Sequence, residues 1–260
     1  MDGARHMSGD RFQVITSSTH REYRNLVRGL TRIVWPEFML HDPVANENWH
    51  ELLERFADFQ FALYDSEKNR VAGMGNSFPL RWEEPLENLP DDGWDWAFTE
   101  AVKNHKQGVM PNIHCAIQII IHPDYRSQGL SAPIIQAVRA VTKAQGLRTL
   151  IIPIRPSEKS HYPLTGMDDY ITWKTDDELP FDAWLRAHVR LGARIIKVCH
   201  QSKTIRGTRA EWEVWTKMKF PQSGSYIIPG ALNPIEMDVE KNEGVYVEPN
   251  VWIVHEMNWL

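Results

Sequence analysis

A short polar turn stands between two patterned segments in the middle of the sequence. The residues from Ala116 to Ile121 are mostly apolar and β-branched, which predicts a strand, and apolar residues from Ile134 onward recur as in a helix. The turn consists of Arg126, Ser127, Gln128, Gly129, Leu130 and Ser131. Unpaired N–H groups at a helix N-terminus bind anions, and glycine permits close approach to the backbone. The turn is a candidate diphosphate cradle; the alternative is an ordinary helix start.

Four other side chains are candidates for acid–base chemistry or substrate binding. His188 lies in a helical pattern, and an imidazole with a pKa of about 6.5 can serve as general acid or base. Tyr162 is an alternative acid and His114 a candidate base. Arg155 follows a predicted strand and could bind a carboxylate as a fork. For each of them the alternative is a packing or surface role, and Cys115 is a poor nucleophile because a buried thiol is usually inert.

Other common site patterns are missing from the sequence. His188 and His200 flank Cys199 within one segment, whereas zinc ligands come in tighter pairs, so no metal is expected. No Ser–His–Asp arrangement follows from the spacing. The single Gly129 falls short of a dinucleotide or phosphate-loop fingerprint.

Composition narrows the class of protein. The 260 residues are 42% hydrophobic and 24% charged, which is ordinary for a globular protein with a sizeable core. The net charge of -5 provides no basic field, so we expect no nucleic-acid partner. No apolar run approaches the roughly 18 residues of a membrane span. Two cysteines cannot build a disulfide framework, which favours a reduced, cytoplasmic location.

The elements that must position the candidate residues alternate between strand and helix patterns. Strands are predicted at 12–16, 58–65, 70–82, 116–121, 147–156 and 193–205, with 209–218 paired to the last. Helices are predicted at 19–35 with Thr19 as N-cap, and at 46–56, 94–108, 131–145 and 181–192. These patterns predict one mixed α/β domain at 11–220 with insertions at 82–108 and 157–180, and a β-rich extension at 221–260 with a hairpin across 240–244. Residues 1–10 are expected to be disordered or expression-derived.

The spacing Ile-x-His-Pro-x-Tyr-Arg-x-x-Gly-x-Ser resembles the coenzyme A signature of the GNAT superfamily of N-acetyltransferases, from about Phe12 to Met218. Ser131 departs from the family's glycine or alanine but is still small. The resemblance implies a mixed, mostly antiparallel sheet flanked by helices. It also implies that the diphosphate binds the N–H groups of 126–131. Pantetheine would pair with Ile119, Ile120 and Ile121, and the strand at 149–154 would diverge to open an acyl cleft.

The resemblance also implies a catalytic role for His188. In the family, a tyrosine at this position gives a proton to the departing thiolate of coenzyme A. The segment around His188 is also similar to GNAT-like loading domains of polyketide synthases, which decarboxylate malonyl-CoA. A threonine and an arginine that assist there fall near Ile154 and near Lys203 in this sequence, and neither residue type is kept, which argues against decarboxylation.

These observations favour one function and leave two alternatives open. The expected enzyme transfers acetyl from acetyl-CoA, or another acyl-CoA, to a small-molecule amine without a metal. The insertions and the extension would enclose the acceptor. One alternative is decarboxylation of malonyl-CoA or S-acyl transfer to the pantetheine thiol of a carrier protein; the other is a non-catalytic acyl-CoA-binding protein. Strand-rich tails in this fold often pair between subunits, so a homodimer is one expected state.

Overall fold

The computed structural model describes residues 11–257, so the prediction for residues 1–10 falls outside it. The strands are β1 (Phe12–Thr16), β2 (Phe61–Asp65), β3 (Arg70–Leu80), β4 (Ile113–Ile121), β5 (Thr149–Ile154), β6 (Arg194–Gly207), β7 (Gly224–Tyr226), β8 (Ile235–Asp238) and β9 (Glu243–Glu256). The helices are α1 (Tyr23–Val27), α2 (Leu30–Val34), α3 (Pro43–Glu54), α4 (Gly93–Lys106), α5 (Ser131–Ala144), α6 (Met167–Tyr170), α7 (Ala183–Arg190) and α8 (Arg209–Thr216).

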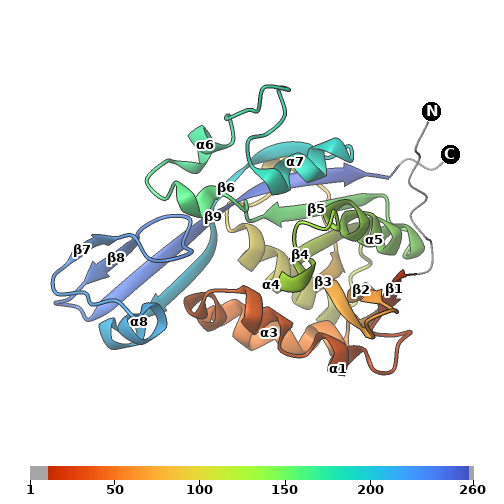
Figure 1. The fold of residues 1–260 in the computed structure, drawn as a ribbon, viewed down its shortest axis with the longest axis horizontal. Helices are drawn as coiled ribbons and strands as arrows, with labels where there is room; N and C mark the ends of the chain where they lie inside the picture. The colour runs from red at the N-terminus through yellow and green to blue at the C-terminus, as the bar shows by residue number, and fades with distance from the viewer. Residues whose placement is uncertain (1–10, 258–260) are drawn as a thin grey trace.

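The strands form one sheet in the order β1-β2-β3-β4-β5-β9-β8-β7, and β6 also pairs with β9. Within residues 11–257, β4 and β5 are the parallel neighbours and the other named strand pairs are antiparallel. Helices α1 to α4 cover one face of the sheet, and α5 and α7 cover the other (Figure 1). The predicted mixed, mostly antiparallel sheet flanked by helices is confirmed.

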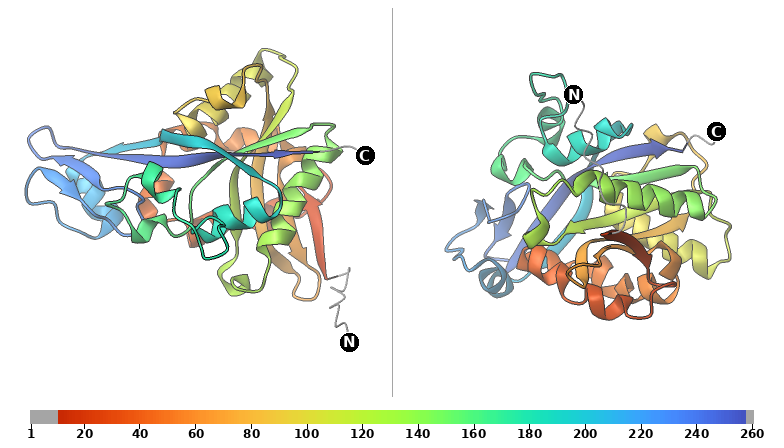
Figure 2. Two further views of the ribbon diagram at one scale, coloured as in Figure 1. Left: turned by 90° about the horizontal axis from the view of Figure 1, so that it is seen from above. Right: turned by 45° about the vertical axis from the view of Figure 1, so that its right-hand side comes forward.

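The last strand lies inside the sheet. β9 pairs with β5 from Thr149↔Glu256 to Ile154↔Val251, and with β6 over a longer stretch on its other side. Beyond the body of the sheet, β7, β8, the start of β9 and α8 form an arm (Figure 2). The arm has its own apolar cluster, which includes Trp212, and Phe38 from the 3-10 helix before α3 belongs to the same cluster.

Two predicted elements differ in the structure. The segment predicted as a strand at 209–218 contains α8, because the side chains of Thr208 and Glu211 form a capping box that starts a helix there. The single helix predicted at 19–35 is two short helices. Gly29 has a φ of 80° and interrupts it, and the first helix begins at Tyr23, so Thr19 is not its N-cap.

Candidate active site

The parallel strands β4 and β5 separate soon after they meet. Their pairing is limited to His114↔Leu150 and Cys115↔Ile151, although β4 continues to Ile121. The indole Nε1 of Trp94 donates a hydrogen bond to the carbonyl of Ile117 at 2.7 Å, just past the last pair. Ile117 thus lies where β4 no longer pairs with β5, and the predicted divergence of the two strands is confirmed.

The turn after β4 has the backbone of an anion cradle. Ser127 and Gly129 have φ values of 59° and 75°, and the N-cap residue of α5, Leu130, makes no side-chain capping bond. The first N–H groups of α5 therefore keep their capacity for an anion. The turn is anchored to β2, because the hydroxyl of buried Tyr125 donates a hydrogen bond to Asp65 at 2.7 Å.

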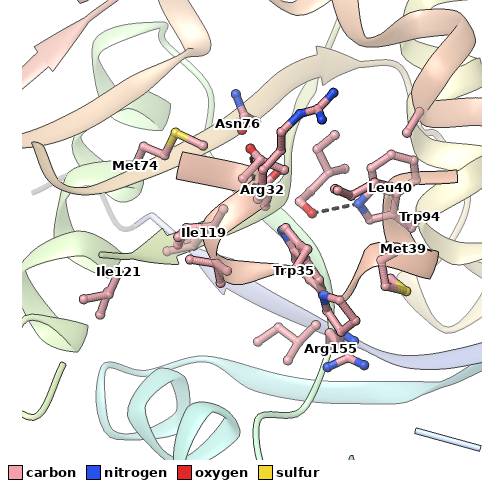
Figure 3. A pocket seen from close by; sticks show the side chains of 18 of the residues that line it. Arg32, Trp35, Met39, Leu40, Met74, Asn76, Trp94, Ile119, Ile121 and Arg155 are labelled. Atoms are coloured by element: carbon pink, nitrogen blue, oxygen red, sulfur yellow. Dashed lines mark hydrogen bonds between the residues drawn. The ribbon is translucent and has the colours of Figure 1, made fainter. Parts of the chain in front are cut away.

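One cavity joins the cradle to the strand divergence. It has a volume of about 1070 Å³, and Figure 3 shows Ile119, Trp35 and Arg155 around it. The sequence-predicted residues that line it are Ile119, Ile120, Ile121, Arg126, Ser131 and Arg155. Ser127, Gln128, Gly129 and Leu130 complete the cradle turn without lining the cavity. The structure therefore places five of the nine predicted coenzyme-binding residues, together with Arg155, on the wall of one cavity.

His188 lies beside this cavity but not on its wall. Its ring is fully buried in α7, and its Nδ1 is 2.9 Å from Nε2 of His255 on β9. Burial, reinforced by His255, lowers the pKa of His188 well below its ordinary value, so the ring is neutral. Trp184, one helical turn earlier, packs edge-on against His188 and lines the cavity instead.

His114 and Tyr162 also lie away from the cavity wall. His114 is fully buried, its Nδ1 is 2.7 Å from the hydroxyl of Thr142, and burial lowers its pKa to about 3. Tyr162 is partly exposed in an aromatic group formed by the inserted segment, which includes Trp173 and Phe181. His114 and Tyr162 thus contact neighbouring side chains and do not line the cavity.

Arg155 lines the cavity within a network of buried groups. Its Nε donates to Glu248 at 2.9 Å, and the hydroxyl of Tyr246 donates to the same carboxylate at 2.8 Å. Glu248 is fully buried, so the guanidinium neutralises it. The charge of Arg155 is thus largely satisfied within the protein.

A second buried ion group reaches the cavity, and sequence analysis did not assign it a role. Lys203 lines the cavity, and its Nζ lies 2.7 Å from Asp42 and 3.8 Å from Asp95. Burial, together with the charge of Asp42, raises the pKa of Asp95 to about 7 against the opposing effect of Lys203. The three residues are far apart in the chain, so no local spacing could have revealed them.

Potential metal ligands gather elsewhere among the described residues. His50, Glu51 and Glu54 on α3 have ligand atoms within 4.8 Å of one another. Glu51 is already paired with Arg55 and Lys106. In addition, no helix within residues 11–257 combines the length and the apolar character that crossing a bilayer requires.

Comparisons with known proteins agree with this geometry. No family model matches the sequence. The chain is 31% identical over 248 residues to "Arginine N-acetyltransferase avaD" of Aspergillus versicolor, with 85% of each chain covered. Among solved structures, it is similar to the loading GNATL domain of CurA from Lyngbya majuscula, with a TM-score of 0.60, 15% identity, and 94% and 97% of the two chains covered. It is also similar to the GphF GNAT-like decarboxylase in complex with isobutyryl-CoA, with a TM-score of 0.57, 13% identity, and 95% and 100% covered. The chain therefore belongs to the GNAT superfamily of N-acetyltransferases and is an acyl-CoA-dependent N-acetyltransferase.

Proposed function

We propose that the protein transfers acetyl from acetyl-CoA to a nitrogen of arginine or a closely related small amine. The observation that carries this proposal is the divergence of β4 and β5 at the anion cradle within one cavity. The acceptor class is supported by the identity with the arginine N-acetyltransferase, which extends over 85% of each chain.

The unpaired part of β4 suits the pantetheine arm of acetyl-CoA. From Gln118 to Ile121 this strand has no β5 neighbour, so its backbone groups on that side need other partners. Pantetheine contains two amides, which can complete such bonds as an added strand does. With the diphosphate on the turn at 126–131, the thioester would lie in the gap beside Ile117.

Acetyl transfer then requires two proton movements. The neutral amine attacks the thioester carbonyl, a C–N bond forms, and the C–S bond breaks as the thiolate gains a proton. Of the two carboxylates on the cavity wall, Glu248 is bound to Arg155 and Tyr246. Glu158 is partly exposed, and its ion-pair partner in the described structure is the exposed His161 at 3.3 Å. We assign Glu158 to bind the cationic acceptor and accept its proton.

His188 is retained in this proposal as the candidate that protonates the thiolate. Because the ring is neutral, it must take that proton from the nitrogen that has attacked the thioester and pass it to the sulfur, and its position makes the idea testable. Trp184 lines the cavity where His188 does not, so proton delivery needs a shift of that indole or a water path. His188→Asn should lower kcat by about a hundredfold if the ring is the acid, given the usual contribution of general acid catalysis. Unchanged kcat, with the melting temperature preserved, would remove His188 from the mechanism.

Decarboxylation of malonyl-CoA is less well supported. Ile154 gives the cavity wall an apolar side chain where the loading domains carry threonine. Lys203 keeps a positive charge where they carry arginine, but Asp42 at 2.7 Å already neutralises it. A malonyl carboxylate would therefore compete with Asp42 for the ammonium of Lys203.

The experiment that tests the proposed function measures thiol release from acetyl-CoA with arginine, agmatine, lysine and an arylalkylamine as acceptors. Mass spectrometry identifies the acetylated product, and malonyl-CoA is supplied in a parallel reaction to detect carbon dioxide. We expect arginine or its nearest analogue to be acetylated with the highest kcat/KM. Binding of acetyl-CoA without acetylation of any of these amines would contradict the proposed acceptor class.

A further inference from the structure

The cavity wall carries an excess of positive charge that the proposed chemistry does not use. The cationic lining residues are Arg24, Arg28, Arg32, Arg126, Arg155 and Lys203. The anionic lining residues are Glu158 and Glu248. This excess occurs in a chain whose net charge is -5, so the general composition does not explain it.

Three of these cations have neither an anionic partner in the described structure nor a place in the cradle turn. Lys203 is paired with Asp42, Arg155 is paired with Glu248, and Arg126 belongs to the cradle turn. Within the part of the chain that the structure describes, the other three arginines form no ion pair; they are Arg24, Arg28 and Arg32. Arg24 donates one hydrogen bond to the carbonyl of Leu53 at 3.3 Å.

These three arginines, called the arginine row here, lie in α1 (Arg24), at the C-cap of α1 (Arg28) and in α2 (Arg32). They recur every fourth residue, and each lines the same cavity although the helix is interrupted at Gly29. Figure 3 shows Arg32 among the side chains that line the cavity. All three are exposed, so their guanidinium groups are accessible to a ligand that enters from solvent.

The row lies on the opposite face of the sheet from the cradle. Ile120 shares an apolar cluster with Leu30 at the start of α2, whereas Ile121 packs against the cluster that contains Leu130 at the start of α5. Successive side chains of a strand point to opposite faces. An acyl-CoA bound to the cradle therefore approaches the gap from the α5 face, and the arginine row lies on the face left to the acceptor.

We propose that Arg24, Arg28 and Arg32 form a second anion site, which binds an oxyanion of a substrate on the face opposite the cradle. This inference rests on the proposed function and refines it. The oxyanion can come from the acceptor's carboxylate or from the 3′-phosphate of coenzyme A, since guanidinium binds both groups through paired N–H donors. The position on the acceptor face favours the carboxylate, and predicts an acceptor that is an amino acid and not a simple amine.

The test compares Arg28→Gln/Arg32→Gln with a matched control, Arg21→Gln/Arg190→Gln. Both control arginines are exposed and lie outside the cavity lining, so the control removes the same total charge. KM is measured for arginine and for agmatine, which is arginine without its carboxylate, and for acetyl-CoA and its 3′-dephospho form. We expect the cavity variant to raise KM for arginine by about ten- to a hundredfold and to leave KM for agmatine within about twofold.

Each result either identifies the source of the oxyanion or contradicts the proposed anion site. A rise in KM for acetyl-CoA that is absent for the dephospho form assigns the row to the 3′-phosphate. No selective rise, or the same rise in the control variant, overturns the inference. If the wild type acetylates neither arginine nor agmatine, the proposed function fails by itself. Calorimetric binding of arginine, agmatine and adenosine 3′,5′-bisphosphate to both variants then still decides whether the row binds an oxyanion.

Discussion

Two glycines at the ends of α5 allow the cradle to be tested with a matched pair of substitutions. Gly129 and Gly146 have φ values of 75° and 71°, and a Cβ at either position would meet no atom within 4 Å. Replacing either residue by tryptophan therefore costs a similar strain, about 1–2 kcal/mol. Only Gly129 belongs to the cradle, so Gly129→Trp should abolish the rise in melting temperature that acetyl-CoA gives the wild type, and Gly146→Trp should keep it.

A thermal-shift series with acetyl-, propionyl-, malonyl- and free coenzyme A measures this difference. At a hundred times Kd, the ligand stabilises the wild type by about 2.7 kcal/mol, which is readily detected. If Gly129→Trp responds to acetyl-CoA as Gly146→Trp does, the diphosphate does not bind at this turn.

Lys203 provides a second test at the scale of single residues. Its ammonium lies between Asp42 and Asp95 and is almost fully buried, so Lys203→Met leaves two carboxylates without a cation. We expect the free energy of unfolding in urea to fall by about 3–5 kcal/mol. The control Lys197→Met, on the same strand and without an ion pair in the described structure, should change it by about 0.5 kcal/mol or less. Equal effects of the two variants would show that Lys203 does not stabilise the buried acids.

The sequence could predict the part of the site that consecutive residues form, but not the parts that depend on contacts between residues far apart in the chain. The cradle was predictable because its features, a small-residue turn and a helix start, lie within 126–131. The surroundings of His188 were not, because its partner His255 comes from β9, 67 residues later. The cluster of Lys203 with Asp42 and Asp95 likewise depends on tertiary contacts between separate elements.

At the scale of elements, α8 shows how a short local signal can override a misleading pattern. The sequence around Trp212 and Val214 alternates as in a strand, but Thr208 and Glu211 cap a helix, and the indole Nε1 of Trp212 donates to the carbonyl of Gly244 at 2.9 Å. The predicted strand at 209–218 missed this cap. The partner of β6 is instead β9, which pairs with β5 along its other edge.

The cap of α8 leads to a prediction for this element. Thr208→Ala removes the hydroxyl that accepts from the N–H of Glu211, and should lower the free energy of unfolding by about 1 kcal/mol. Thr208→Ser keeps the hydroxyl and is the matched control. Both are measured by urea denaturation. An equal loss in the two variants would indicate that the methyl group, and not the cap, is responsible.

At the scale of the whole molecule, the sheet combines the site with its supporting arm. β9 borders β5 at the cavity end and β8 in the arm, so one strand connects the acyl cleft to α8 and the hairpin. Glu248 and Asn250 from this strand line the cavity. Substitutions in the arm that shift β9 are therefore expected to change the acceptor site, although the arm lies outside the cradle.

Buried titratable groups make the stability of the whole molecule depend on pH in two opposite ways. Burial lowers the pKa of His114 to about 3 and that of His255 to about 4, from an ordinary value of 6.5, and lowers that of His188 in the same direction. Below pH 6.5 the unfolded chain binds protons that the folded chain does not, so stability is lost as pH falls from 6.5 toward 4. Asp95, whose pKa is raised to about 7, acts in the other direction, because its stabilising effect is lost as pH rises from 3.8 to about 7.

The hydrogen bond to Asp168 raises the pKa of His200, which therefore acts in the same direction as Asp95. Three buried imidazoles outweigh these two groups, so the protein should be less stable at about pH 5 than at about pH 7, with a slope of about 1.4 kcal/mol per pH unit for each uncompensated group. His114→Gln keeps a hydrogen-bonding group beside Thr142. It should reduce this slope by the contribution of one group, about 1.4 kcal/mol per pH unit. His50→Gln, at an exposed position of α3, is the control variant. The slope is measured from urea unfolding at several pH values, so the lower absolute stability of a core variant does not affect it. A slope in His114→Gln equal to that of the wild type would mean that His114 is protonated alike in the folded and unfolded chains.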